Sequence, residues 1–153
     1  YGAIQVVIHP QSIIHSMVEY IDGSIIAQLG VPSMKIPIQY ALTYPERWES
    51  PGEESLDFYR LSQLTFEEPK RNLFPALDLA YEAGKIGGTM PAVLNSSNEE
   101  AVRFFLEEKI SFLEITKLVE KVMAKHQVVK NPSLEEILVA DRWARGFIST
   151  LVT

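Results

Sequence analysis

The polar side chains that could do chemistry gather in one segment near the start of the chain. His9, Gln11, Ser12 and His15 stand there among valines and isoleucines, and Gln28 follows nearby. Imidazole, hydroxyl and amide groups can bind a substrate or move a proton. The two histidines are six residues apart with a proline between them, which is no recognised metal-ligand spacing. At each histidine, a hydrogen-bonded structural role is therefore the alternative to a catalytic one.

A predicted β-hairpin carries these residues. Two β-rich runs flank Asp22-Gly23, and this dipeptide between such runs is the strongest short-range signal for a two-residue type I′ turn. Pairing outward from the turn places Val18 opposite Ala27. Because side chains alternate along a strand, one apolar face is expected, made of Val18, Tyr20, Ile25, Ala27 and Leu29. The other face is mixed and would cover a ligand, meet a second subunit or face water.

Composition limits the classes of function. The chain has 153 residues, of which 46% are hydrophobic, so it can bury a sizeable core. Its net charge of −6 disfavours nucleic acid as a partner. The absence of cysteine excludes disulfides and thiolate metal ligands and fits a reducing compartment. No window reaches the roughly 18 apolar residues of a membrane span. Since the chain begins at Tyr1 without Met, we expect further sequence before it.

The remainder of the chain changes from strand signals to helix signals. A helix is expected at Met34–Thr43 with Ser33 as its cap, and short strands at 56–59 and 64–66. Four helical patterns then follow, at 73–83 and 90–108 and after two capping boxes that begin at Ser111 and Ser133. The polar block at 95–100 is expected to be a solvated stripe or a hydrogen-bonding patch between helices.

These elements predict an α+β fold in two parts. Residues 1–66 would form a small, mostly antiparallel sheet with a helix, and residues 67–72 would form a linker. Consecutive helices with short connections predict a four-helix bundle over residues 73–153. Neither a glycine-rich phosphate loop nor a nucleophile elbow occurs, so the residues alone name no reaction.

The order of these motifs resembles the 1-deoxy-D-xylulose 5-phosphate reductoisomerase family. The resemblance is carried by Ile8-His9-Pro10-Gln11-Ser12 running on to Val18, and by Ala27-Gln28-Leu29-Gly30. Further matches lie at 56–58, 64–66 and 93–99, so the resemblance covers nearly the whole chain. The family's NADPH domain, acidic metal ligands and phosphate site have no counterpart here. The resemblance therefore implies the last part of an enzyme, inactive by itself and with no metal ligand in this chain.

The resemblance also implies an activity and its participants. The family rearranges and reduces 1-deoxy-D-xylulose 5-phosphate to 2-C-methyl-D-erythritol 4-phosphate, a step of non-mevalonate isoprenoid biosynthesis, with NADPH and Mg²⁺ or Mn²⁺. His15 and Ser12 would lie on the substrate side in supporting roles, and Met34 would lie beside the nicotinamide. A homodimer through the hairpin sheet is expected, in the bacterial cytoplasm or the plastid stroma. The alternative is a non-catalytic dimerisation or interaction module.

Overall fold

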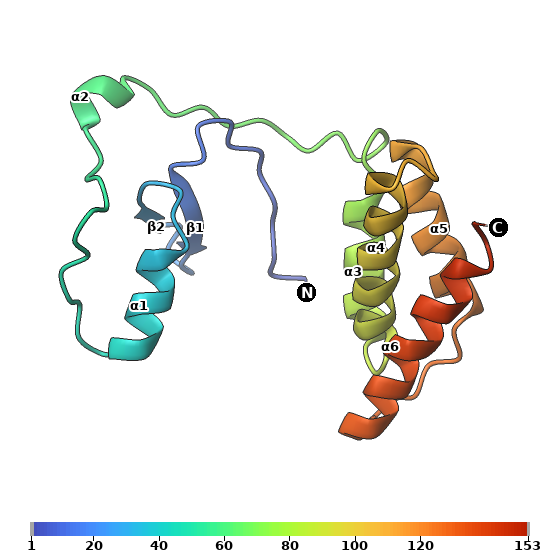
Figure 1. Ribbon diagram of the computed structural model, residues 1–153. Coiled ribbons are helices and arrows are strands. Elements are labelled where there is room, and N and C mark those ends of the chain that lie inside the picture. Colours follow the sequence, from blue (N-terminus) through green and yellow to red (C-terminus); the bar gives the residue numbers. More distant parts are fainter. Residues whose placement is uncertain (1, 153) are drawn as a thin grey trace. The chain divides into compact units, whose positions relative to one another are not determined.

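The structure is a computed structural model that describes residues 2–152. Within these residues it has a two-stranded antiparallel sheet and six helices, consistent with the α+β class (Figure 1). The chain divides into two compact units, one formed by Gln5–Pro69 and the other by residues 70–152 with residues 2–4. None of the described helices combines the length and apolar character that a membrane span requires.

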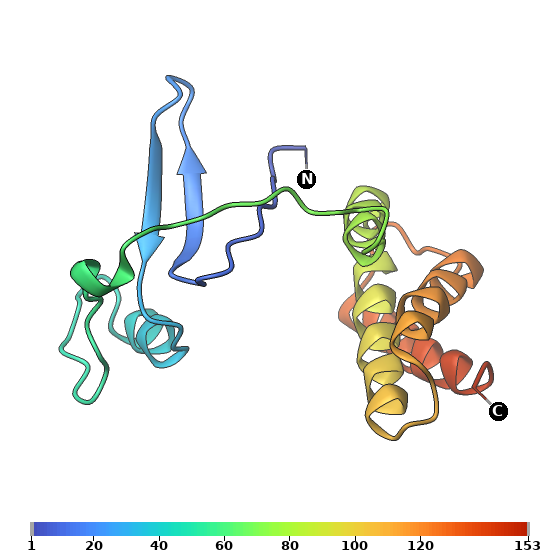
Figure 2. The same cartoon turned by 90° about the horizontal axis from the view of Figure 1, so that it is seen from above.

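The sheet is the predicted hairpin, formed by β1 (Ile14–Glu19) and β2 (Ile25–Leu29) (Figure 2). Its turn differs from the expected two-residue type. Gly23 N donates to Tyr20 O at 3.0 Å, and Tyr20 N donates to Ser24 O at 2.9 Å, which makes a three-residue loop. Gly23 has a φ of 82°, while Asp22 is not among the residues with positive φ. A type I′ turn needs positive φ at both positions, so the prediction was wrong.

The different loop shifts the pairing of the strands by one residue. Val18 lies opposite Ile26 and Met17 lies opposite Ala27, so the predicted pairing of Val18 with Ala27 was wrong. A one-residue shift moves side chains to the other face of a sheet. The expected single apolar face is therefore also wrong, because Val18 and Ile26 share one face while Met17, Ile25 and Ala27 share the other. Val18, Ile25 and Ile26 are 55–63% exposed in this chain.

The rest of this unit contains two helices, α1 (Lys35–Thr43) and α2 (Phe58–Leu61). The predicted strand at 56–59 is wrong because Asp57 caps α2. Its Oδ1 accepts hydrogen bonds from Tyr59 N at 3.0 Å and from Arg60 N at 3.3 Å. Residues 64–66 form no strand. The nearest pairing is a single bridge in which Ile8 and Glu67 exchange two backbone hydrogen bonds of 2.9 Å.

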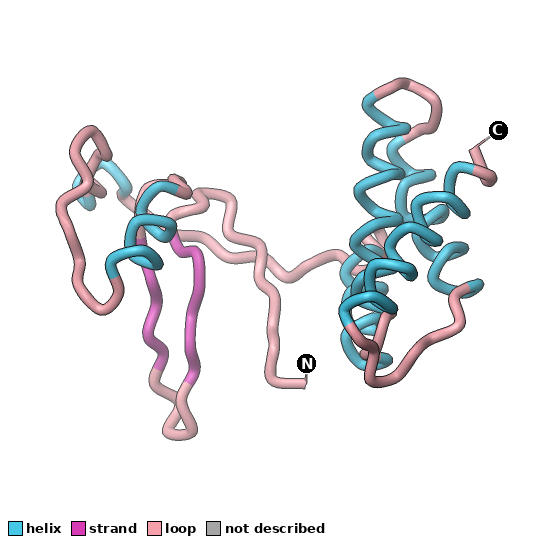
Figure 3. Tube along the Cα trace, turned by 60° about the horizontal axis from the view of Figure 1, so that its bottom comes forward, coloured by secondary structure: helices cyan, strands magenta, loops and turns pink. Residues whose placement is uncertain are grey.

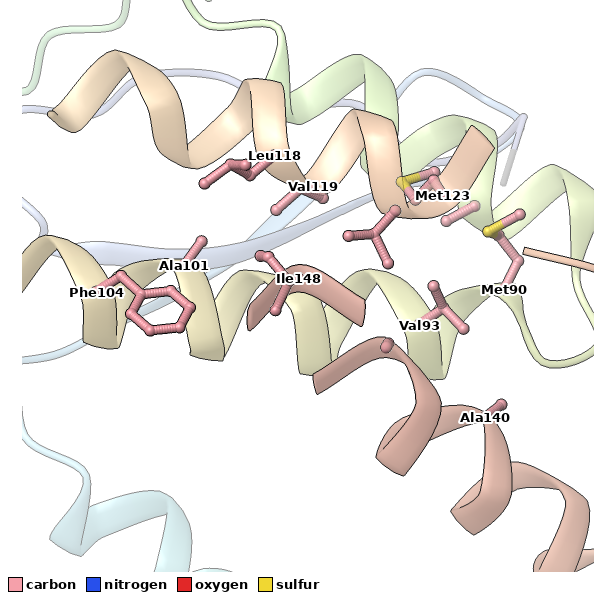
Figure 4. Packing of buried hydrophobic residues seen from close by; sticks show 12 residues of the cluster. Met90, Val93, Ala101, Phe104, Leu118, Val119, Met123, Ala140 and Ile148 are labelled. Atoms are coloured by element: carbon pink, nitrogen blue, oxygen red, sulfur yellow. The ribbon is translucent and has the colours of Figure 1, made fainter. Parts of the chain in front are cut away.

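The second unit consists of α3 (Ala76–Ile86), α4 (Met90–Leu106), α5 (Phe112–Lys125) and α6 (Leu134–Ser149) (Figure 3). Helix α4 packs against the other three helices, and α5 also packs against α6. Figure 4 shows how apolar side chains of α4, α5 and α6 fill the space between these helices. The buried residues of this core are Ala83, Met90, Val93, Ala101, Phe104, Leu118, Val119, Val122, Met123, Ala140, Ala144 and Ile148.

The ends of these helices show which boundaries can be predicted from local sequence. Both predicted capping boxes are present, with Ser111 paired to Glu114 and Ser133 to Glu136. The first helix of the unit begins at Ala76 and not at residue 73, because residues before a proline disfavour helical backbone and Pro75 stands at its start. It also continues through residue 84 to Ile86, and Gly87, whose φ is 69°, follows as the C-cap.

The polar block at 95–100 divides between two environments. Ser96 and Ser97 are fully buried, and their hydroxyls donate to carbonyls one turn earlier in α4, at 2.8 and 2.7 Å. Glu99 instead accepts a hydrogen bond of 2.5 Å from Arg145 of α6. That ion pair is the expected patch between helices. The two serine hydroxyls, in contrast, bond only to carbonyls of their own helix.

Candidate functional site

The first histidine of the polar segment has a structural role. Its Nδ1–H donates to Thr65 O at 2.9 Å, and its ring stacks on Phe66 with centroids 5.0 Å apart. Gln11 donates to Thr65 Oγ1 at 2.8 Å and accepts from Thr65 N at 3.2 Å. His9 and Gln11 thus join the start of this unit to residues 65–67, more than fifty positions later. The structural alternative for His9 fits these contacts.

Ser12 lies at the end of the turn that this segment makes. Its N–H donates to His9 O at 3.0 Å, and its φ of 53° is in the left-handed region that non-glycine residues rarely adopt. Strained backbone of this kind clusters at functional sites when the surrounding contacts enforce it. Here the contacts of His9 and Gln11 with Thr65 enforce it. Ser12 itself is exposed, so its hydroxyl is accessible.

His15 lies where the pairing of the two strands is irregular. The register shifts between Ile14 and Ser16, which leaves His15 as the extra residue of a bulge. A bulge bends the strand and redirects the side chain that it carries. A Cβ built on Gly30 would lie 3.7 Å from His15 Nε2 and 3.6 Å from Gln28 Nε2. The structure thus brings the exposed imidazole together with the Gln28 amide, beside a glycine that leaves space next to them.

Met34 occupies the N-cap position of α1 and makes no capping hydrogen bond through its side chain. Ser33, the predicted cap, instead immediately precedes it, and its hydroxyl accepts from Lys35 N at 3.3 Å. The Met34 side chain is 71% exposed. A thioether in this position is an adaptable apolar surface on which a planar ring could pack.

The described residues contain no group of three or more histidine, aspartate and glutamate side chains placed to hold a metal ion. The third histidine, His126, belongs to the helical unit. Its Nε2 lies 2.6 Å from Thr89 Oγ1, and its ring packs on Trp143 with centroids 5.2 Å apart. Burial lowers the pKa of His126, so the imidazole is neutral at pH 7. These contacts give it a structural role.

The described part of each unit carries an open surface hollow. The first has a volume of about 510 Å³ and borders the apolar side of α1 and Trp48. The second has a volume of about 450 Å³ and lies between the end of α5 and the start of α6, beside His126 and Trp143. Neither hollow is lined by Ser12, His15 or Met34. The candidate residues are therefore exposed on their own unit and not enclosed by it.

Comparisons with known proteins point to one family. Residues 29–147 match the family described as DXP reductoisomerase C-terminal domain. A 1-deoxy-D-xylulose 5-phosphate reductoisomerase of Pelotomaculum thermopropionicum is 60% identical over 147 residues, covering 95% of this chain and 38% of that protein. This chain therefore spans well under half the length of such relatives.

Solved structures agree with the sequence matches. The reductoisomerase from Zymomonas mobilis, in complex with NADPH, is 50% identical, with a TM-score of 0.87 over 95% of this chain and 38% of its own. A DOX-P reductoisomerase in complex with NADPH, fosmidomycin and magnesium is 41% identical, with a TM-score of 0.88 over 97% of this chain and 38% of its own. Both of those proteins are in complex with NADPH, and the second also holds magnesium.

Proposed function

Because this chain belongs to the DXP reductoisomerase C-terminal domain family, we propose that it is the carboxyl-terminal part of a 1-deoxy-D-xylulose 5-phosphate reductoisomerase. Such an enzyme would convert 1-deoxy-D-xylulose 5-phosphate to 2-C-methyl-D-erythritol 4-phosphate, in the non-mevalonate route to isoprenoids. The observation that carries the proposal is 60% identity over 147 residues to a protein of that name. Identity of this extent, together with a matching fold, goes far beyond a shared architecture.

The accessible residues of the hairpin unit supply the supporting part of the site. We propose that His15 and Ser12 face the sugar phosphate, where an imidazole and a hydroxyl can donate or accept hydrogen bonds. The bulge at His15 and the left-handed backbone at Ser12 support these roles, since both direct a polar side chain out of regular structure. Gln28, for which the sequence predicts no specific role, lies with His15 beside Gly30.

The cofactors would be held mainly by the part of the enzyme outside this chain. When bound, NADPH supplies a hydride, and Mg²⁺ or Mn²⁺ polarises the substrate oxygens. Met34 fits the nicotinamide side of the site, because its thioether is exposed and adaptable. The described residues offer no cluster for the metal, so its ligands would come from elsewhere in the enzyme.

Two measurements test the catalytic proposal. The isolated chain should not oxidise NADPH in the presence of 1-deoxy-D-xylulose 5-phosphate, and turnover at a native-like rate would contradict its supporting role. In the full-length enzyme, His15→Ala should lower kcat/KM while the unfolding transition stays in place, since His15 is exposed. Unchanged kinetics would reduce His15 to a structural residue.

The architecture and location also enter the proposal. We assign residues 1–66 to the end of the catalytic domain, residues 67–72 to a linker and residues 73–153 to a C-terminal four-helix bundle. The packing of α4 against α3, α5 and α6 supports the bundle. The absence of cysteine supports a reducing compartment, either the bacterial cytoplasm or the plastid stroma.

The second candidate function is dimerisation, and it is compatible with the first. Val18 and Ile26 share one face of the hairpin, and each is more than half exposed. Apolar patches of this kind typically mark interaction sites, and open strand edges can pair with another chain. We therefore propose a homodimer through the hairpin sheet. Sedimentation equilibrium of the isolated chain would show a dimer, and a strict monomer at high concentration would count against an autonomous interaction module.

A further inference from the structure

The irregular segment at 44–57 is fastened along helix α1. Thr43 Oγ1 donates to Glu46 O at 2.7 Å, and Gln39 Nε2 donates to the carbonyls of Trp48 and Glu49 at 3.0 Å each. Helix α1 has nine residues, none of them buried, and a helix this short is marginal by itself. These bonds therefore hold the helix and the segment to one another.

A tight turn then brings the segment to the start of the same helix. Glu53 N donates to Ser50 O at 3.2 Å, and Gly52 has a φ of 85°. Proline in the second position and a positive-φ glycine in the third are typical of a type II β-turn, and Pro51 and Gly52 fill those positions. The backbone at Glu53 is consequently well defined.

The Glu53 carboxylate contacts the residues on both sides of Met34. Its Oε1 lies 2.9 Å from Lys35 Nζ, and its side chain is only 11% exposed. Hydrogen bonds from Lys35, and next from the Ser33 hydroxyl, hold the pKa of Glu53 below its usual range, so the carboxylate is ionised at neutral pH. Methionine cannot cap a helix, and the first turn of α1 has no acidic residue. Glu53 supplies the negative charge that a helix N-terminus favours.

We infer that Glu53 is a positioning residue that fixes the turn at residues 33–35 and so presents Met34 to the nicotinamide of NADPH. This inference rests on the proposed function, which places Met34 on the cofactor side. Glu53 is not expected to touch the cofactor or the substrate, and it acts only through the backbone that carries the Met34 side chain.

The first test needs only this chain and no cofactor. The four methionines give methyl signals in ¹³C-methyl-methionine NMR, and Met34→Leu identifies the one from Met34. Glu53→Gln should shift the Met34 signal, and Lys35→Gln should shift it in the same direction, because each removes one side of the ion pair. Glu54→Gln, which changes the exposed neighbouring carboxylate, is the matched control and should leave the signal in place. An unmoved Met34 signal in both Glu53→Gln and Lys35→Gln overturns the inference.

The second test measures NADPH affinity of the full-length enzyme by cofactor fluorescence, without turnover. Glu53→Gln should raise the NADPH dissociation constant about threefold to tenfold, which is the size of one ordinary net hydrogen bond, because the lost contact acts on the cofactor only through Met34. Glu54→Gln should leave it unchanged. If Met34→Ala weakens NADPH binding and Glu53→Gln does not, the positioning role is wrong while the proposed function stands. If neither variant changes the affinity, the placement of Met34 beside the nicotinamide fails.

Discussion

A glycine in the turn between α3 and α4 gives a sharp test of the helical unit. Gly88 has a φ of 57°, and a Cβ added there would lie 2.2 Å from the carbonyl oxygen of Val129. Two hydrogen bonds of 3.1 Å fasten the same place, one from Thr89 N to Val129 O and one from Val129 N to Thr89 Oγ1. Gly88→Ala therefore forces the segment around Val129 to move away from the start of α4.

The magnitude follows from these contacts. Left-handed backbone costs a non-glycine residue about 1–2 kcal/mol. Each hydrogen bond lost as the segment moves contributes about 1 kcal/mol net. Gly88→Ala should then lower the free energy of unfolding by about 3–4 kcal/mol. With a urea m-value of about 2 kcal/mol/M, the midpoint of unfolding would fall by about 1.5–2 M. Urea titration followed by far-UV circular dichroism measures this shift, because the helical unit dominates the signal.

Gly146→Ala is the matched control. Gly146 lies inside α6, and a Cβ added there meets nothing within 4 Å. Alanine in a helix interior is more favourable than glycine by about 0.5–1 kcal/mol, so this variant should raise the midpoint. A Gly88→Ala protein within about 1 kcal/mol of the parent would refute the close approach of the Val129 carbonyl. A loss of similar size in both variants would refute the reasoning as well, since only one of them meets an obstacle.

Three further outcomes are expected. Burial lowers the pKa of His126 below its ordinary value of 6.5, so the unfolded chain binds this proton more readily than the folded chain. The free energy of unfolding should therefore fall as pH drops below 6.5. In urea titrations between pH 5 and 7, His126→Gln should make the free energy of unfolding depend less on pH. Ser133→Ala removes the cap of α6 and should lower the free energy of unfolding by about 1 kcal/mol, seen as a lower thermal midpoint. Ser97→Ala removes a buried hydroxyl whose 2.7 Å bond ends on a carbonyl of its own helix; because alanine favours helix, calorimetry should find a change below about 1 kcal/mol.

Local chemistry was enough to predict the elements whose signals lie within a few residues. The capping boxes at Ser111 and Ser133 are closed by a glutamate three positions later, and both form as expected. The strand predicted at 56–59 failed for a similarly local reason, since Asp57 is as good a helix cap as either serine. There the apolar neighbours favour a strand, and the capping carboxylate favours the helix that forms.

The Asp-Gly dipeptide alone does not determine the register of the hairpin. Asp22 Oδ1 accepts hydrogen bonds from Ser24 N at 2.9 Å and from Ser24 Oγ at 2.6 Å. These bonds stabilise a loop in which only Gly23 takes positive φ. The Ser24 hydroxyl, two positions after the aspartate, thus favours the three-residue loop over the two-residue turn that Asp-Gly signals.

Contacts between distant residues could not be predicted from spacing. The role of His9 depends on Thr65, and that of Glu53 on Lys35 across an irregular segment. The Pro51-Gly52 dipeptide does signal a type II turn. The local sequence does not indicate that this turn brings the Glu53 side chain to Lys35. The placement of Ser12, His15 and Met34 in a catalytic site stays a prediction of the family resemblance.

The central position of α4 has a consequence for motion within the helical unit. Helix α3 packs mainly on α4, whereas α5 and α6 contact both α4 and each other. A helix that packs on only one neighbour can detach while the other helices keep their mutual contacts. The free energy of local unfolding is therefore lower for α3 than for α4. Amide protons of α3 would exchange with solvent ahead of those in α4, and a protease would find its first cleavage point at that end of the unit.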